Sequence, residues 1–288
     1  YKIFVCMKKN KIYKIGELFC GPGGLAQGAL DAKISKNGTT YKLSHAWASD
    51  YSIESCNTFR KNITNGSKCL VICENVHNLK IRELPPIDAF AYGFPCNDFS
   101  IIGEKKGFNG EFGPLYSYGV SVINTFKPKF FVAENVGGLI HANEGKAFKK
   151  ILSDLGNCGN GYELTIHRYK AEEYGVPQMR HRIIIVGIDK RLNMKFKVPA
   201  PTTINKAKTA REAIEEPTIP KESANNELTR QSLTVVERLQ YIKPWENAWT
   251  AKLPEHLKLN VKNAKLSQIY RRLHPDKPSY TITGSGGG

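Results

Sequence analysis

The stretch Ile87-Asp88-Ala89-Phe90-Ala91-Tyr92-Gly93-Phe94-Pro95-Cys96-Asn97-Asp98-Phe99-Ser100 decides the fold class of this chain. Its first six residues form a near-continuous apolar run, which predicts a buried strand. The strand stops at Gly93, so Cys96 begins a loop at the carboxyl end, the edge at which open α/β sheets bind ligands. Cys96 is therefore a candidate nucleophile, or a small buried side chain if nothing lowers its thiol pKa.

A glycine turn near the start of the chain supports the same fold class. Residues 14–19 predict a strand, Cys20-Gly21-Pro22-Gly23-Gly24 predicts a turn, and residues 25–30 predict a helix. Strand, glycine turn and helix open nucleotide-binding α/β units, because glycines let the backbone approach a ligand and the helix N-terminus offers free N–H groups. The Gly-x-Gly-Gly spacing differs from the dinucleotide pattern Gly-x-Gly-x-x-Gly, which argues against NAD.

Polar side chains follow several of the remaining predicted strands. The strands are expected at residues 43–48, 69–73, 129–133, 164–169 and 183–188, with helices at residues 52–59, 114–126 and 146–155. Asp50 follows a strand, where a carboxylate binds ribose hydroxyls or caps the next helix. Glu134 directly follows another strand. Arg180 and Arg182 alternate as the last strand begins, which predicts that they share one face.

Composition limits the class of protein. The chain has 288 residues, 41% hydrophobic and 24% charged, which suits one large domain or two unequal ones. No apolar run approaches the roughly 20 residues of a membrane helix, and no secretory signal is visible, so we expect a cytoplasmic protein without a membrane partner. The seven cysteines follow no disulfide or zinc-ligand spacing. No metal site is predicted, and free thiols suit a reducing compartment.

The charge distribution predicts a polyanionic partner. The net charge is +16: residues 1–188 carry 24 basic and 16 acidic residues (+8), and residues 189–288 carry 18 and 10 (+8) in about half the length. Nucleic acid is the first expectation for such an excess. The second part is polar, broken by prolines and weakly periodic, which indicates a smaller recognition region. Residues 101–113, rich in glycine and containing Lys105 and Lys106, predict either a lid or a solvated loop.

Five motifs, taken in this order, make the chain resemble the cytosine-C5 DNA methyltransferases of bacterial restriction-modification systems. They are Phe19-x-Gly21-x-Gly23-Gly24, Gly93-Phe94-Pro95-Cys96, Glu134-Asn135-Val136, Gln178-x-Arg180-x-Arg182, and Arg272-Leu273 followed by Pro278 and Thr281-Ile282. The resemblance covers residues 14–188 and 270–283. It implies an α/β, Rossmann-like fold of the S-adenosylmethionine-dependent methyltransferases, with a mixed, mostly parallel sheet and a smaller target-recognition domain.

The resemblance also implies a division of the chain and a reaction. Residues 11–190 would form the catalytic and cofactor-binding domain, residues 191–268 the target-recognition region, and residues 269–288 a return segment toward the catalytic domain. The enzyme would be a DNA (cytosine-5-)-methyltransferase. It would move a methyl group from S-adenosylmethionine to C5 of a cytosine flipped out of double-stranded DNA.

The family pattern assigns roles residue by residue. Cys96 would add to C6 of cytosine, Glu134 would hydrogen-bond ring N3, and Arg182 would hold O2. Arg180 would support Arg182, or contact a phosphate instead. The cofactor-binding residues would be Phe19, Gly21, Gly23, Gly24, Asp50, Tyr51, Asn75, Val76, Pro95 and Leu115. Asn75 stands where the family usually has Asp, and its amide oxygen can still accept a hydrogen bond from the adenine amino group.

One family segment is not found. The family chain ends with an Asn-containing segment that completes the cofactor site, and none precedes Gly288. A truncated sequence or a second subunit that supplies the segment is favoured over an inactive remnant, because Cys96, Glu134 and Arg182 are present. Two other functions stay open: a non-catalytic or split-subunit DNA-binding protein that needs a partner, and a tRNA cytosine-C5 methyltransferase. The Cys-Phe-Thr tripeptide of the tRNA branch is absent.

Overall fold

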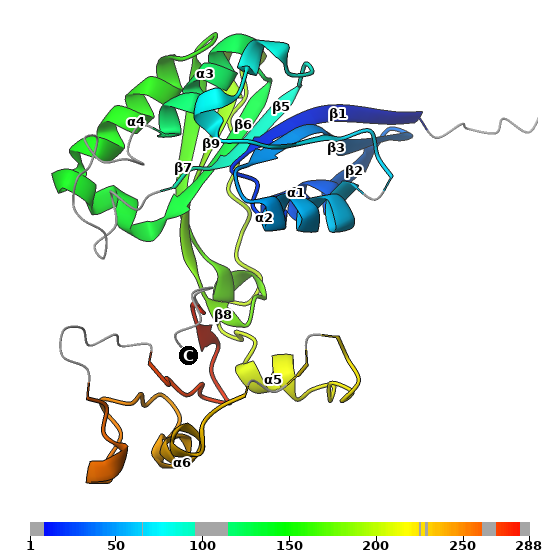
Figure 1. Cartoon of the computed structure of the whole chain (residues 1–288). Coiled ribbons are helices and arrows are strands. Elements are labelled where there is room, and N and C mark those ends of the chain that lie inside the picture. Colours follow the sequence, from blue (N-terminus) through cyan, green and yellow to red (C-terminus); the bar gives the residue numbers. More distant parts are fainter. Residues whose placement is uncertain are drawn as a thin grey trace, which may run out of the picture. The chain divides into compact units, whose positions relative to one another are not determined.

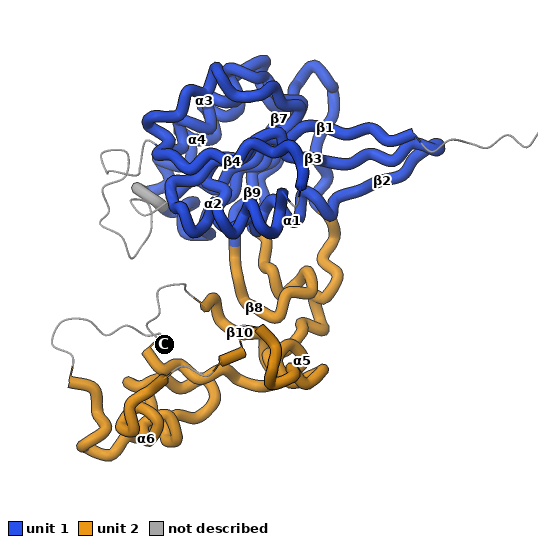
Figure 2. Tube along the Cα trace, turned by 45° about the vertical axis from the view of Figure 1, so that its right-hand side comes forward, with its two compact units in different colours: residues 1–168, 182–198 blue, residues 169–181, 199–288 orange. Residues whose placement is uncertain are grey.

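The computed structural model describes residues 9–64, 66–95, 115–224, 226–227, 230–260 and 269–282. The chain divides into two compact units (Figure 2). Unit 1 comprises residues 1–168 and 182–198, and unit 2 comprises residues 169–181 and 199–288. The chain therefore leaves unit 1 twice. The functions assigned above to residues 11–190, 191–268 and 269–288 remain predictions.

Unit 1 is organised around one sheet with the strand order β2-β3-β1-β5-β6-β9-β7, with β4 paired to β3 (Figure 1). Its strands are β1 (Lys9–Leu18), β2 (Lys33–Lys36), β3 (Thr39–Asp50), β4 (Leu70–Cys73), β5 (Ala89–Gly93), β6 (Phe130–Val136), β7 (Tyr162–Lys170) and β9 (His181–Asp189). β1 is parallel to β3 and β5, β3 is parallel to β4, and β5 is parallel to β6. β2 and β9 are antiparallel to their neighbours. The predicted mixed, mostly parallel α/β sheet is confirmed.

Helices pack on both faces of this sheet, because successive strand residues point to opposite sides. The helices of unit 1 are α1 (Gly24–Asp31), α2 (Ile53–Phe59), α3 (Tyr116–Phe126) and α4 (Lys146–Asn157). Phe90 and Tyr92 of β5 belong to the core shared with α3 and α4. Ala89 and Ala91 face the core that includes residues of α1. The carboxyl ends of β1, β3, β4 and β5 are thereby held at one edge.

Two strands are longer than the sequence predicted, and one strand was not predicted at all. β1 begins at Lys9 rather than at residue 14, β3 begins at Thr39 rather than at residue 43, and β2 has no predicted counterpart. Most of the extra residues are polar, and the isoleucines among them, Ile12 and Ile34, are exposed, so these segments show no clear hydrophobic period. Backbone pairing of β3 with both β1 and β2 holds them extended instead.

Unit 2 contains little regular structure in its described part. It holds β8 (Gln178–Met179), β10 (Ser279–Tyr280), α5 (Ala210–Ile214) and α6 (Leu233–Tyr241). β8 and β10 pair in parallel, and Thr281 Oγ1 donates to the Met179 carbonyl at 2.8 Å. Two of the recognised motifs, about a hundred residues apart in sequence, are thus adjacent. Across the described residues, every helix falls short of the length and apolarity needed to span a membrane.

Candidate active site

The chain that leads to Cys96 is firmly held up to Pro95. β5 is buried, and Phe94, just after it, is 3% exposed. The Asn135 side-chain amide donates to the Phe94 carbonyl at 3.0 Å, while its own oxygen accepts from the Val136 N–H at 2.8 Å. Asn135 therefore fixes the backbone at the start of the predicted nucleophile loop. Cys96 and the predicted lid at residues 101–113 lie outside the described residues.

Glu134 and Arg182 lie together at the carboxyl end of β6. Glu134 is in β6 and Arg182 is in the antiparallel neighbour β9, and Arg182 Nε lies 2.7 Å from Glu134 Oε1. The two side chains are 29% and 20% exposed, so the pair faces partly outward. Glu134 is also the register partner of Gly93, where an added Cβ would lie 3.1 Å from Glu134 Oε2. Glycine at position 93 leaves room for this carboxylate beside the strand that leads to Cys96.

Arg180 is placed differently from Arg182. β9 begins at His181, and the Arg180 N–H donates to the Gln178 carbonyl, a local turn that interrupts the extended backbone. The prediction that both arginines share one face of the strand is therefore wrong. Arg180 is exposed and belongs to unit 2, whereas Arg182 belongs to unit 1.

The glycine turn is shaped around Asp50. Gly21 and Gly23 have φ values of 53° and 102°, in the left-handed region that favours glycine. The Gly21 N–H donates to Asp50 Oδ2 at 2.9 Å, and the Ser52 N–H donates to Oδ1 at 3.0 Å. Ser52, not Asp50, is the N-cap of α2. Asp50 thus joins the end of β3 to the turn after β1.

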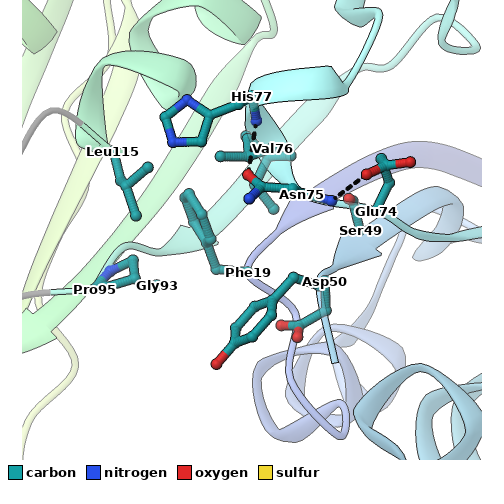
Figure 3. A pocket seen from close by; sticks show the side chains of 12 residues that line it. Phe19, Ser49, Asp50, Glu74, Asn75, Val76, His77, Gly93, Pro95 and Leu115 are labelled. Carbon is teal, nitrogen blue, oxygen red and sulfur yellow. Dashed lines mark hydrogen bonds between the residues drawn. The ribbon is translucent and has the colours of Figure 1, made fainter. Parts of the chain in front are cut away.

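A cavity of about 490 Å³ opens at this edge (Figure 3). Seven of the predicted cofactor residues line it: Phe19, Asp50, Tyr51, Asn75, Val76, Pro95 and Leu115. The predicted Gly21, Gly23 and Gly24 are not in the lining. They shape the turn behind it, where a Cβ on Gly23 would meet Ile63 at 2.5 Å. The cavity walls come from the ends of β1, β3, β4 and β5 and from the residue before α3.

The wall also contains residues that were not predicted to bind the cofactor. They are Leu18, Ser49, Glu74, His77 and Gly93. His77 Nδ1 lies 2.7 Å from the Tyr118 hydroxyl, and the His77 N–H donates to the Asn75 side-chain oxygen at 3.1 Å. The Asn75 oxygen therefore caps the short helix that follows β4 and keeps one lone pair for a ligand. The available signal was position: Leu18, Ser49 and Gly93 lie at the carboxyl ends of strands, and Glu74 and His77 follow β4.

Burial argues against four of the described cysteines as nucleophiles. Burial raises the pKa of the Cys56, Cys69 and Cys158 thiols to about 11, and it raises the pKa of Cys20 further. A thiol is reactive as the thiolate, so a raised pKa keeps these side chains inert. Among the described residues, His, Cys, Asp and Glu side chains form no group of three or more that could hold a metal ion.

Comparison with known proteins matches this chain to DNA methyltransferases. Residues 13–285 match the family model described as C-5 cytosine-specific DNA methylase. The chain is 55% identical over 283 residues to the Type II methyltransferase M.BbvI of Brevibacillus brevis, a match that covers 96% of this chain and 75% of that protein. It is 36% identical to the Type II methyltransferase M.NgoFVII of Neisseria gonorrhoeae, over 96% of this chain and 71% of that protein.

A solved structure agrees on the fold. It is a crystal structure from Escherichia coli described as a DNA modification methyltransferase encoded within a prophage. The TM-score is 0.60 at 20% sequence identity, and the match covers 93% of this chain and 82% of that one. At this identity the similarity supports the fold alone.

Proposed function

The chain belongs to the C-5 cytosine-specific DNA methylase family and is a DNA cytosine methyltransferase. On this basis we propose how its residues catalyse methyl transfer. The methyl donor is S-adenosylmethionine, the target is a cytosine flipped out of duplex DNA, and Cys96 forms a covalent adduct with it. The enzyme serves as the modification partner in a restriction-modification system. The observation that carries this proposal is the Glu134–Arg182 pair beside Gly93, at the edge where the cavity opens.

The cavity suits the proposed donor. Its volume of about 490 Å³ lies within the ordinary range for small-molecule sites. The Asp50 carboxylate stands at the end of the second long strand, where such folds bind ribose hydroxyls, and Tyr51 is 79% exposed, which leaves its ring free to cover an adenine. The Asn75 oxygen can accept from an amino group. When bound, S-adenosylmethionine supplies an electrophilic methyl group on a sulfonium centre.

The chain's own residues activate the base. C5 of cytosine is a poor nucleophile until a thiolate adds to C6, so Cys96 forms a bond to C6 and moves electron density to C5. Negative charge builds on the ring, and a protonated Glu134 at N3 with Arg182 at O2 relieves it. Once C5 carries the methyl group, a water acting as base takes the C5 proton, and the bond between Cys96 and C6 breaks.

Glu134 and Arg182 contact each other in this structure, so the flipped base has to be received between them or beside them. Glu134 Oε1 is engaged by Arg182, while Oε2 faces Gly93. A base that arrives beside Gly93 therefore meets the second carboxyl oxygen. The Arg182 guanidinium, already beside this carboxyl, lies close enough to hold the O2 atom.

Transfer of tritium from labelled S-adenosylmethionine to duplex DNA tests the proposal. Wild-type protein labels DNA, Cys96→Ala abolishes the label, and Cys69→Ala, a change of the same size outside the site, keeps it. Labelling by Cys96→Ala, labelling of RNA but not DNA, or no labelling by the wild-type protein would contradict the proposal. Bisulfite sequencing of DNA from cells that express the chain then gives the methylated sequence, whose recognition we assign to residues 191–268.

A further inference from the structure

The amino-terminal parts of three strands form a surface that the methyl-transfer reaction does not use. We name it the basic ribbon: residues 9–14 of β1, residues 33–36 of β2 and residues 39–42 of β3. Six of these fourteen residues are lysines and none is acidic; the lysines are Lys9, Lys11, Lys14, Lys33, Lys36 and Lys42. All six are exposed, and in the described part of the chain none of their ammonium groups forms an ion pair. The ribbon is therefore a dense positive charge with no acidic residue among its own.

The strand register places these charges on both sides of the ribbon. Lys11 is the partner of Tyr41, which is the partner of Ile34, so Lys9, Lys11 and Lys36 share one face. Ile12 is the partner of Lys42, which is the partner of Lys33, so Lys14, Lys33 and Lys42 share the other face. A flat acidic surface could contact only one of these faces at a time. Duplex DNA carries phosphates along both walls of each groove, so it can contact lysines on both faces of the ribbon.

The ribbon also offers donors suited to phosphates. Thr39, Thr40, Ser35 and Asn10 lie among the lysines, and hydroxyl and amide groups are common phosphate contacts in protein–DNA complexes. At its base, Tyr13, Ile34, Tyr41 and Leu43 help to line a shallow hollow of about 320 Å³. Lys11 and Lys129 each place Nζ 5.4 Å from the Tyr13 ring centroid.

The ribbon and the cavity lie at opposite ends of β1. Lys9 begins the strand, and Leu18, its last residue, lines the cavity. Nine residue steps of an extended strand span about 30 Å. A duplex that contacts the ribbon is therefore bound by a different surface of unit 1 from the one that receives the target base.

We propose that the basic ribbon binds a second segment of duplex DNA, without sequence preference, while the cavity acts on another. Phosphate contacts of this kind add affinity that falls with salt and does not depend on sequence. The ribbon would hold the enzyme on long DNA between methylation events. The ribbon lysines also lie on strand edges, in β1 and β2, where charge prevents edge-to-edge pairing. Lys42 is in the central strand β3, where edge protection gives no reason for a lysine.

The first test is the stoichiometry of duplex binding by the full chain. Titration of fluorescent 12-base-pair duplexes of mixed sequence at low salt is expected to give two duplexes per chain. K33A/K36A/K42A is expected to weaken the second binding step about tenfold or more, and to lower its salt slope by two to three, at about 0.9 per lost phosphate contact. K33R/K36R/K42R keeps the second step. K61A/K68A/K149A, which removes the same charge from exposed lysines outside the ribbon, also keeps it.

Several results would overturn the proposal. The wild-type chain could bind only one duplex, or K33A/K36A/K42A could leave the affinity of the second binding step unchanged. The control variant K61A/K68A/K149A could lose as much affinity in that step, or the second step could accept duplex RNA but not DNA. If K33A/K36A/K42A self-associates in sedimentation while its DNA binding is unchanged, the lysines serve instead to prevent strand edges of two chains from pairing. Lysine acetylation of the wild-type protein needs no variant: duplex DNA should protect Lys42 at low salt, and unchanged labelling would count against the ribbon.

Methyl transfer separates this proposal from the proposed function. On a short duplex that contains the target sequence, K33A/K36A/K42A should match the wild-type rate. On DNA of several thousand base pairs, its rate should fall several-fold. Loss of transfer on the short duplex would show that the ribbon belongs to the catalytic machinery. A chain that binds two duplexes but transfers no methyl group would sink the proposed mechanism and leave the ribbon standing.

Discussion

Each of the two units of this chain is stabilised internally by a different kind of contact. Unit 1 buries aromatic and aliphatic side chains on both faces of a sheet. The described part of unit 2 has one small apolar cluster, at Ile242, Ala248, Leu253 and Leu257, and depends on arginines. Arg238 is 8% exposed and donates from Nε to the Leu257 carbonyl at 2.6 Å. The Arg271 guanidinium lies 5.2 Å from the Trp245 ring centroid and 4.4 Å from that of Tyr280.

This difference suits unit 1 to be a rigid scaffold and suits unit 2 to the target recognition that we propose for residues 191–268. A layered core spreads its stabilisation over many contacts and fixes the strand ends at which the cavity opens. Contacts between an arginine and a ring or a carbonyl are few, and each involves only two or three residues. The surrounding residues can therefore be substituted without disrupting a hydrophobic core. Substitutions that affect one unit and spare the other test this contrast directly.

The largest expected effect is on the cavity. Asp50→Ala removes a carboxylate proposed to bind ribose, and it leaves the Gly21 and Ser52 N–H groups without their acceptor. Hydrogen bonds to a charged group contribute about 1.5–3 kcal/mol, so affinity for S-adenosylmethionine should fall about 10- to 100-fold. Isothermal calorimetry measures this change. Arg271→Ala, in unit 2, should leave cofactor affinity unchanged; a less than threefold effect of Asp50→Ala would remove Asp50 from the site.

The second effect is on the packing of unit 1. A Cβ at Gly187 would lie 2.2 Å from the Phe131 ring, so Gly187→Ala should lower the free energy of unfolding by about 1–3 kcal/mol. Phe131→Leu makes space for that methyl group. The double variant should therefore be less destabilised than the sum of the two single variants, as measured by urea unfolding. Strict additivity would mean that the clash is relieved elsewhere.

A third substitution should weaken unit 2 alone. Arg271→Ala removes two cation–π contacts, each typically about 0.5–1 kcal/mol, so the expected loss is about 1–2 kcal/mol. Arg271→Lys should recover part of it. Hydrogen exchange followed by mass spectrometry reads protection peptide by peptide, and only peptides of unit 2 should exchange faster. Faster exchange in β5 or β6 would show that the two units are not stabilised separately.

The smallest effect depends on pH. The Asp189 side chain is 2% exposed, and hydrogen bonds from Arg191, together with the Asn160 amide, hold its pKa at about 2. A lowered carboxyl pKa means that the stabilisation is complete above the usual value near 4 and is lost as the pH falls toward 2. Arg191 is largely exposed, so Asp189→Asn should cost only about 1 kcal/mol at pH 7. Urea unfolding between pH 2 and 7 should show the difference disappear at the acid end.

The sequence predicts the parts of unit 1 that carry a hydrophobic period. The run at residues 87–92 is apolar apart from Asp88, and the run at residues 183–188 is apolar throughout. Both contain core residues of a buried strand, β5 and β9. The residues that follow such strands were expected at one edge, and Phe19, Asp50, Asn75 and Pro95 line one cavity there. Glycine patterns were more ambiguous, because Gly21 and Gly23 shape a turn without lining the cavity.

The remaining features depend on register and on polar contacts, which leave no period in the sequence. Pairing of Arg182 with Glu134 requires a particular antiparallel alignment of β6 with β9. β2 is held by backbone pairing with β3 and by a hydrogen bond between the Ser35 and Thr40 hydroxyls, so its lysines and serine resemble a loop in the sequence. In unit 2, Arg238 and Arg271 are fixed by carbonyl oxygens and rings contributed from distant positions. A sequence that is merely basic and proline-rich cannot distinguish those arginines from exposed ones.

The place of β9 has a consequence for synthesis of the chain on the ribosome. β9 lies between β6 and β7 in the sheet, although it is the last of the three to be made. Until about residue 189 has left the ribosome, β6 and β7 have no strand between them, and the Glu134 carboxylate has no Arg182. The nascent chain therefore has unpaired strand edges while residues 171–180 are being made. Addition of β9 then closes the sheet and brings Arg182 to Glu134, the pair proposed to act on the base, in the same step.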